Sequence, residues 1–141
     1  MILPNGKPLT PEETVGMITS DAGRKEFKGV VRMHGKTSDR EYDVELLMAN
    51  GEIMAMEVTF LGEDTLRGKK ALAELKKLGG SEGELTFIRF KTGDATRNLF
   101  SDNARSLLDI KTKVLLDDLK IRIKTADTTR PSAERMYFVF D

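Results

Sequence analysis

Apolar residues that recur at every second position predict a β-hairpin in the first half of the chain. Asn50-Gly51 marks its turn, because both residues tolerate the positive φ angles of a type I′ turn. The flanking strands carry apolar residues with the two-residue period of a half-buried strand: Tyr42, Val44, Leu46 and Met48, then Met54, Met56, Val58 and Phe60. We interpret the methionines as core residues rather than as an exposed docking groove, because they follow the strand alternation.

A helix over 10–21 is predicted before the hairpin. Thr10 at the N-cap, Pro11 at the first helical position and Glu13 at the third form a capping box. Asp21-Ala22-Gly23 is expected to end the helix. A carboxylate such as Glu13 invites a catalytic interpretation, but the cap already gives it a structural role.

A second helix is predicted over 65–78, and Gly79-Gly80 is expected to end it. Its apolar stripe has the three- and four-residue spacing that packs on a sheet: Gly68, Ala71, Leu72, Leu75 and Leu78. Basic residues occupy the outer faces: Arg67, Lys69, Lys70, Lys76 and Lys77. These five residues fit either an ordinary solvated face or a patch that binds an anion or a partner.

The remaining pattern completes an α+β fold. It predicts a strand over 27–33, a polar loop over 34–40, a central strand over 83–91, a longer C-terminal helix near 95–116, a strand over 119–124 and an apolar segment over 136–140. We therefore expect a mainly antiparallel sheet of about four to five strands with helices packed at its face. Residues 1–141 are expected to form a single domain.

Composition is that of a soluble protein, with 39% hydrophobic residues, 33% charged residues and a net charge of zero. No apolar stretch approaches the roughly 20 residues that span a bilayer, and the N-terminus does not resemble a signal peptide. We therefore expect a cytoplasmic protein without a membrane association. The charge is unevenly placed, because residues 1–66 carry 12 acidic and 7 basic residues, whereas 67–141 carry 11 and 16.

Catalytic and metal-binding motifs are absent from the sequence. His34 is the only histidine and there is no cysteine, which excludes a serine–histidine–aspartate arrangement or a multi-histidine metal site within one chain. The common phosphate-binding glycine motifs do not occur. Asp117-Asp118 is a paired carboxylate, but a cation needs several converging oxygen ligands. We expect no enzyme activity, no cofactor and no metal.

Several of these features resemble an uncharacterised archaeal family, domain of unknown function 2226. They are Gly29 at the start of a strand, the Asn50-Gly51 turn followed by Ile53 and Ala55, the helix with Gly68, Ala71, Leu72 and Leu75, and Phe87 in a later strand. The chain is also distantly similar to the bacterial PATAN signalling module. The likeness covers about 10–110 and leaves 111–141 as a C-terminal extension. It implies contacts with other proteins and brings no catalytic residues.

The leading functional prediction is therefore a non-enzymatic protein-interaction or regulatory module, similar to a signalling adaptor. The alternative is a binder of an anionic ligand or nucleic acid through the basic helix residues 67–77, although nucleic-acid binders more often have a net basic domain. Apolar residues on more than one face of the C-terminal helix also predict a homodimer through Leu108 and Leu115. The competing interpretation is that these residues fold back within one chain.

Overall fold

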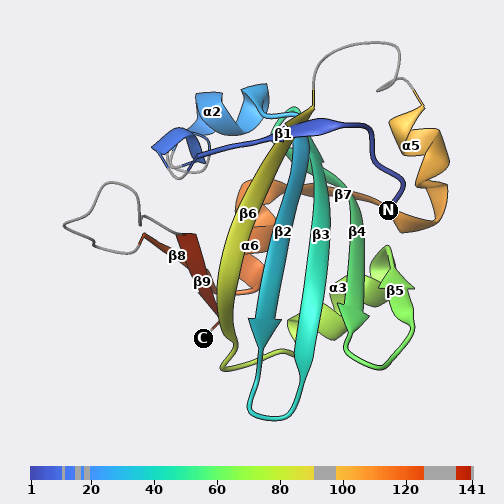
Figure 1. Ribbon diagram of the computed structural model, residues 1–141, viewed down its shortest axis with the longest axis vertical. Coiled ribbons are helices and arrows are strands. Elements are labelled where there is room, and N and C mark those ends of the chain that lie inside the picture. The colour runs from blue at the N-terminus through green and yellow to red at the C-terminus, as the bar shows by residue number, and fades with distance from the viewer. Residues whose placement is uncertain (11, 15–16, 18–19, 91–97, 126–135, 141) are drawn as a thin grey trace.

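One antiparallel sheet dominates the protein (Figure 1). The computed structural model describes residues 1–141 apart from 11, 15–16, 18–19, 91–97, 126–135 and 141. The sheet has nine strands within the described residues. Its four long central strands lie side by side in the order β6, β2, β3 and β4, with the bounds Glu82–Phe90, Gly29–Lys36, Glu41–Ala49 and Glu52–Phe60.

Each outer edge of this four-stranded centre is covered by two short strands. β1 (Gly6–Pro8) pairs with one end of β6, and β9 (Met136–Phe140) pairs with the other. β7 (Leu107–Lys111) and β5 (Thr65–Arg67) divide the outer edge of β4 in the same way. A further strand, β8, pairs with β9 and spans Ile121–Thr125. Short strands of this kind satisfy backbone groups that a long bare edge would expose to aggregation.

The predicted hairpin is confirmed, with one change of register. Asn50 and Gly51 have φ angles of 57° and 78°, as a type I′ turn requires. Met48 pairs with Ile53 whereas Leu47 pairs with Ala55, so Met54 is an extra residue in a β-bulge. The prediction that Met54 shares the core face of β4 is therefore wrong, because the bulge gives that place to Ile53.

The main core lies between one face of the sheet and three short helices. Figure 1 shows α3 (Lys69–Lys76) and α6 (Thr112–Asp118) behind the strands, and α2 (Asp21–Glu26) lies near one end of β2. The most completely buried large side chains of this core include Phe27, Tyr42, Phe60, Met56, Leu75, Leu115, Phe138 and Phe140. A smaller cluster lies on the opposite face of the sheet and is formed by Val30, Leu47, Ala55, Phe90 and Leu99.

The expected four- to five-stranded α+β fold with a longer C-terminal helix is wrong. Residues 107–111 form β7 instead of a helix, and helical structure nearby is confined to α5 (Leu99–Asp102), the 3₁₀ turn η1 (Ala104–Ser106) and α6. β7 pairs with β4, so every second residue of β7 faces the core. The strand therefore partly buries apolar residues that a helix was expected to bury. The first part of the predicted helix, 95–97, lies outside the described residues.

The two earlier helix predictions are partly confirmed. The Thr10 N–H donates to Glu13 Oε2 at 2.9 Å and the Glu13 N–H donates to Thr10 Oγ1 at 3.3 Å, which is the predicted capping box. Residues 12–14 and 17 are helical, and the other positions of 11–19 lie outside the described residues. Asp21-Ala22-Gly23 begins α2 instead of ending a helix, because Ser20 accepts a bond from the Gly23 N–H at 3.0 Å and caps it.

The second predicted helix is shorter than 65–78. Thr65 belongs to β5, and Gly68 turns the chain into α3 with a φ of 60°. A Cβ at Gly68 would lie 3.2 Å from the Arg105 carbonyl oxygen, so this glycine belongs to a tight turn and not to the apolar stripe. Ala71 and Leu75 face the core, whereas Leu72 is only half-buried.

Candidate functional site: the open face of the sheet

The face of the sheet opposite α3 and α6 carries a regular arrangement of charged side chains. Alternate residues of a strand point to the same face, so the residues between the core positions of β2, β3 and β6 share this surface. From Arg32 to Lys36, β2 contributes only cationic or titratable basic groups to this face, and the residues paired with them are carboxylates apart from Thr86, which lies opposite Arg32. We call this set the charge ladder: Arg32, His34 and Lys36 on β2, Glu41, Asp43 and Glu45 on β3, and Glu82 and Glu84 on β6.

The register places opposite charges directly across from each other. Lys36 lies opposite Glu41 on β3 and opposite Glu82 on β6. Arg32 Nε donates to Glu45 Oε2 at 3.2 Å. Opposed pairs of this kind stabilise a sheet by a few tenths of a kcal/mol to about 1 kcal/mol each, so their contribution to folding is modest. Their regularity matters more, because it gives one surface a defined pattern of charge.

His34 lies at the centre of the ladder between two carboxylates. Its Nδ1 is 2.5 Å from Asp43 Oδ1 and its Nε2 is 2.9 Å from Glu41 Oε1. Only the imidazolium can donate from both ring nitrogens. The hydrogen bond with Asp43 raises the pKa of His34 above its usual value, and this effect outweighs the opposing effect of burial. The two carboxylates therefore favour the charged form of His34.

A groove of about 630 Å³ lies at the end of the ladder where β2, β6 and β9 meet. Its lining includes three carboxylates against His34 and one lysine, together with a half-exposed aromatic ring: Glu41, Glu82, Glu84, Lys36 and Tyr137. The two glycines in its lining, Gly35 and Gly83, lie opposite each other on β2 and β6. A Cβ at Gly83 would lie 2.0 Å from the His34 carbonyl oxygen, so the strands approach closely at the bottom of the groove.

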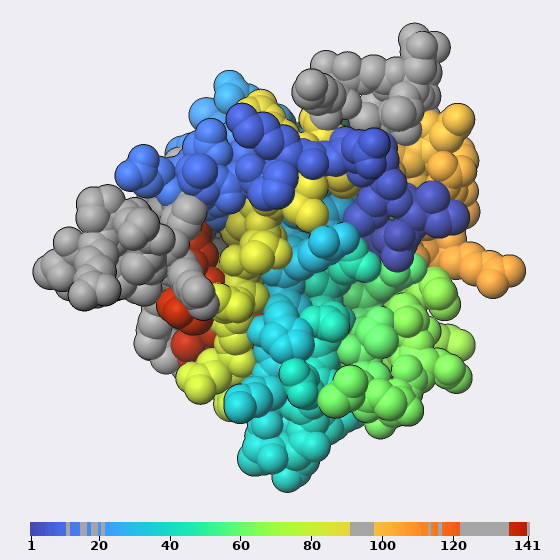
Figure 2. Space-filling model, in the orientation of Figure 1, coloured from blue at the N-terminus to red at the C-terminus, as the bar shows by residue number. Residues whose placement is uncertain are grey.

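The other end of the open face is partly covered. Figure 2 shows the N-terminal residues lying across it, while β2, β3 and β4 reach the surface beyond them. The Asn103 side chain holds this segment, because its Oδ1 accepts from the Ile2 N–H at 2.9 Å and its Nδ2 donates to the Ile2 carbonyl at 2.9 Å. Asn103 also donates to the Leu99 carbonyl at 2.8 Å.

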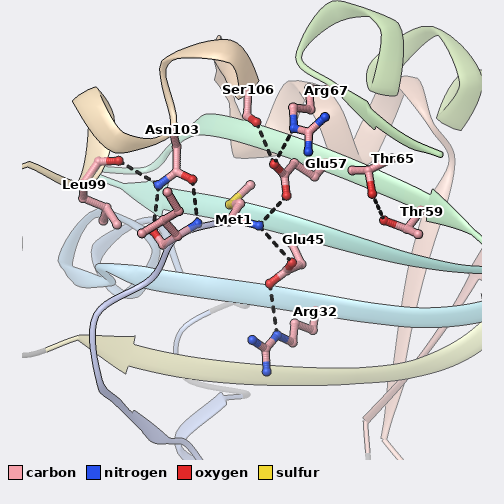
Figure 3. A network of polar contacts seen from close by, with 11 residues as sticks. Met1, Arg32, Glu45, Glu57, Thr59, Thr65, Arg67, Leu99, Asn103 and Ser106 are labelled. Carbon is pink, nitrogen blue, oxygen red and sulfur yellow. Dashed lines mark hydrogen bonds and ion pairs between the residues drawn. The ribbon is translucent and has the colours of Figure 1, made fainter.

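Next to this segment, Glu57 is a buried carboxylate that joins four parts of the chain (Figure 3). Its Oε2 lies 2.5 Å from the Met1 amino nitrogen. Its Oε1 accepts from Arg67 Nε at 3.1 Å and from Ser106 Oγ at 3.0 Å. The contacts therefore connect β4 with β5, with the 3₁₀ turn η1 and with the N-terminal segment. Glu45 Oε1, at 3.6 Å from the same amino nitrogen, joins this cluster to the charge ladder.

The contacts of Glu57 favour its charged form. Burial alone would raise the pKa of this carboxyl, but the bonds from the Met1 amino group and Ser106 and the charge of Arg67 outweigh burial and lower the pKa. With its partners in place, Glu57 stabilises the fold by holding η1 and β5 against β4. It acts as a structural anchor for one border of the open face.

The family of the chain is shown by its N-terminal part. A family described as "Uncharacterized protein conserved in archaea", domain of unknown function 2226, matches residues 1–88. This match covers more than half of the sequence. The chain belongs to this archaeal family. No curated protein and no solved structure matches the chain.

The family match contains the complete charge ladder and Glu57. It ends within β6, so β7, α6, β8 and β9 lie beyond it. The predicted resemblance to this family is thus confirmed. The matched region is 1–88, whereas the prediction was about 10–110. The open face belongs to the family part of the chain, whereas one wall of its groove comes from β9.

The five predicted basic residues differ in whether they are already engaged in ion pairs. Arg67 is bound to Glu57, and Lys77 Nζ donates to Glu74 Oε1 at 3.1 Å. Lys69, Lys70 and Lys76 are exposed on α3. Lys69 and Lys76 lie seven residues apart, which separates their backbones by about 10 Å along the helix axis. Arg67 and Lys77 are therefore engaged with glutamates, and the exposed basic set on α3 extends over about two helical turns.

The predicted self-association residues are mostly inside the protein. Leu115 is 1% exposed and belongs to the main core, and Leu108 is half-buried against the same core. α6 turns Leu115 toward the sheet, so the chain itself covers this side chain, and self-association through Leu108 and Leu115 stays a prediction. The exposed apolar side chains nearby are Leu107 on β7 and Val114 on α6, which are 42% and 47% exposed.

Asp117 and Asp118 are exposed at the end of α6. Among the residues that the structure describes, no three His, Asp or Glu side chains converge as the ligands of a metal ion would. None of the described helices has the length and apolar character needed to cross a membrane.

The charge ladder was not predicted from the sequence, because 34–40 was expected to be a polar loop. β2 instead continues to Lys36, which adds His34 and Lys36 to the open face. A signal was present, since Arg32, His34 and Lys36 alternate with smaller or apolar residues as a half-exposed strand does. That these basic residues lie opposite acidic residues of β3 could be seen only once the register between the two strands was known.

Glu57→Gln is expected to lower the free energy of unfolding by about 1–3 kcal/mol at pH 7. This is the typical cost when a buried charged group loses its hydrogen-bonding partner, as the groups that contact the Glu57 carboxylate would. The lowered pKa sets the pH dependence: the ionised carboxylate stabilises the fold above its ordinary pKa of 4.5, and this contribution is lost as the pH falls through the lower folded-state value. Urea unfolding of wild type and Glu57→Gln at pH 7 and pH 3 measures this.

Glu52→Gln, on the same strand and only half-buried, is the matched control and should change stability by less than about 0.5 kcal/mol. A difference between wild type and Glu57→Gln that stays constant from pH 7 to pH 3 would show that the charge of Glu57 does not stabilise the fold.

Proposed function

We propose that this protein is a non-enzymatic protein-interaction module and that a partner protein docks on the open face of the sheet. The observation that carries the proposal is the charge ladder with the groove at its end. A sheet face that only needs to be soluble requires scattered polar residues. Here the charges lie in rows of one sign, and the groove that they border has three carboxylates against one lysine and His34.

The charge of the groove specifies the kind of partner surface. Basic side chains of a partner would meet Glu41, Glu82 and Glu84, and Tyr137 offers a ring against which an arginine or lysine can lie. Complementary charge speeds encounter and fixes orientation more than it adds affinity. Nucleic acid is disfavoured on this face, since its phosphates would approach the same carboxylates.

The proposal keeps two finer expectations from the sequence. A cytoplasmic location suits a module of this kind, and the distant similarity to the PATAN signalling module suits a regulatory role. Neither adds a catalytic residue. The support for the regulatory role is the pattern of glycines and apolar residues in the family part of the chain.

A second candidate function is binding of an anionic ligand or nucleic acid at the start of α3. Gly68 precedes this helix without a side-chain cap, and two exposed lysines, Lys69 and Lys70, occupy its first turn. Basic residues at a helix N-terminus oppose the helix dipole, whereas an anion bound there would favour it. This arrangement supports an anion site of limited extent, because Arg67 and Lys77 already pair with glutamates.

One affinity experiment separates the two candidates. The immobilised wild-type protein, a ladder variant (Glu82→Lys with Glu84→Lys) and a helix variant (Lys69→Glu with Lys70→Glu) are exposed to an extract of an archaeal source, with and without nuclease. All four positions are exposed, so circular dichroism should be unchanged in both variants. Retained proteins are identified by mass spectrometry at low and at high salt.

Loss of a retained protein from the ladder variant, with retention by the helix variant, supports docking on the open face. The converse result, above all if nuclease removes the retained material, favours the second candidate. Equal retention by wild type and both variants would contradict both proposals.

A further inference from the structure

A second cavity lies on the open face at the end opposite the acidic groove. It has a volume of about 160 Å³ and is bordered by the β3–β4 hairpin, the start of β2, the end of β6 and α5. Its lining contains side chains of the smaller hydrophobic cluster, together with a few polar residues at the border: Lys28, Gly29, Leu47, Met48, Ala49, Asn50, Met54, Phe90, Leu99 and Phe100. The cavity shares no lining residue with the acidic groove.

The volume limits the size of the ligand. An apolar cavity of about 150 Å³ is large enough to hold one benzene ring. The cavity is smaller than the roughly 300–1,000 Å³ of pockets that enclose larger metabolites or cofactors. A molecule with a single ring or a short branched chain therefore fits, whereas a nucleotide does not.

The lining indicates the chemical class. Leu47, Phe90 and Leu99 are buried apolar side chains, and Phe100 is partly exposed. Among the lining residues that the structure describes, Lys28 is the only charged one and Asn50 is the only other one with a polar side chain. An apolar wall with one cation at its border suits a molecule that has an apolar body and one negative group.

The β-bulge in β4 indicates that this cavity is a binding site and not a packing defect. A regular β4 would direct Met54 to the main core with Met56, but the extra residue lets Met54 contribute to the cavity lining. Bulges frequently re-aim a side chain beside a binding site. Methionine suits the wall of such a site, because its flexible, polarisable side chain adapts to a ligand.

We propose that this cavity binds a small carboxylic acid with an aromatic or branched apolar body, whose carboxylate is held by Lys28. The ligand would reach the open face at the end away from the acidic groove, so the site is independent of the docking proposed above. Binding would order the end of the hairpin against α5, because both elements contribute lining residues.

Methionine methyl resonances give a direct test. Methyl-labelled protein is titrated with benzoate and, separately, with benzyl alcohol, which has the same ring without the charge. Met54 reports on the cavity, and Met56, which is fully buried in the main core, is the internal control. A saturable shift of Met54 without a shift of Met56 is expected for benzoate, with weaker binding of benzyl alcohol.

Lys28→Gln should lower the affinity for benzoate about tenfold, as expected for loss of a charge-assisted hydrogen bond, and should leave benzyl alcohol binding unchanged. Lys25→Gln, an exposed basic residue outside the lining, is the matched control. The proposal is overturned if millimolar benzoate produces no saturable Met54 shift. It is also overturned if benzoate binds equally well to wild type and Lys28→Gln, since Lys28 would then not hold the carboxylate.

Discussion

Leu75→Ala is expected to lower the free energy of unfolding by about 2–5 kcal/mol, because truncating a fully buried leucine removes its apolar contacts and leaves a cavity. Leu75 has no exposed surface and lies on the side of α3 that faces the sheet. The only other fully buried residue within α3 is Ala71, so Leu75 supplies most of the apolar contact between this helix and the main core. Denaturant unfolding at constant m-value measures the difference.

Two substitutions on the same helix serve as matched controls. Leu72 is half-buried, so Leu72→Ala should cost less than Leu75→Ala, and Lys70 is exposed, so Lys70→Ala should change stability by less than about 0.5 kcal/mol. The spacing of apolar residues alone predicts the same burial for Leu72 and Leu75. If Leu72→Ala proves as destabilising as Leu75→Ala, α3 is rotated relative to its described position.

Local signals in the sequence predicted the parts of the fold that depend on neighbouring residues. The capping box of Thr10 and Glu13 and the turn at Asn50-Gly51 were found because their backbone geometry restricts the residue types that fit. The alternation of Tyr42, Val44 and Leu46 likewise identified a strand and its buried face. All of these features involve contacts within a few residues, and the structure confirms them.

Contacts between distant segments explain what was missed. Residues 107–111 have an apolar pattern that fits a helix or a strand, and pairing with β4 decides in favour of a strand. The short strands β1, β5 and β7 have too few residues to show a period. The same limit applies to the site: the sequence shows the charges of β2 and β3, but only the register shows that they lie opposite each other.

The position of Leu115 illustrates how this error changed a functional prediction. A long helix over 95–116 would expose apolar residues on several faces, and a second copy of the chain would be needed to cover them. With β7 in the sheet and α6 reduced to Thr112–Asp118, the chain covers Leu115 itself. Among the described side chains of these two elements, the large apolar residues that remain exposed are Leu107 and Val114.

Leu115→Glu is therefore expected to unfold the protein or to lower its stability by about 3–5 kcal/mol, the range seen when a buried charge has no partner. Such a loss is a large fraction of the roughly 5–15 kcal/mol that stabilises a typical domain. Val114→Glu, at the adjacent exposed position, is the matched control and should retain the native circular dichroism spectrum and melting temperature. The two variants differ only in which side of α6 carries the new charge.

Self-association is tested with Val114→Glu and with a second exposed apolar position, Leu107→Glu. Light scattering after size exclusion gives the mass of the wild type, Val114→Glu and Leu107→Glu. If the wild type is a dimer through the exposed apolar residues, these two variants should become monomers with native circular dichroism. A folded monomer produced by Leu115→Glu would contradict the burial of this side chain, since a glutamate there can be tolerated only if α6 presents Leu115 to solvent or to a second copy of the chain.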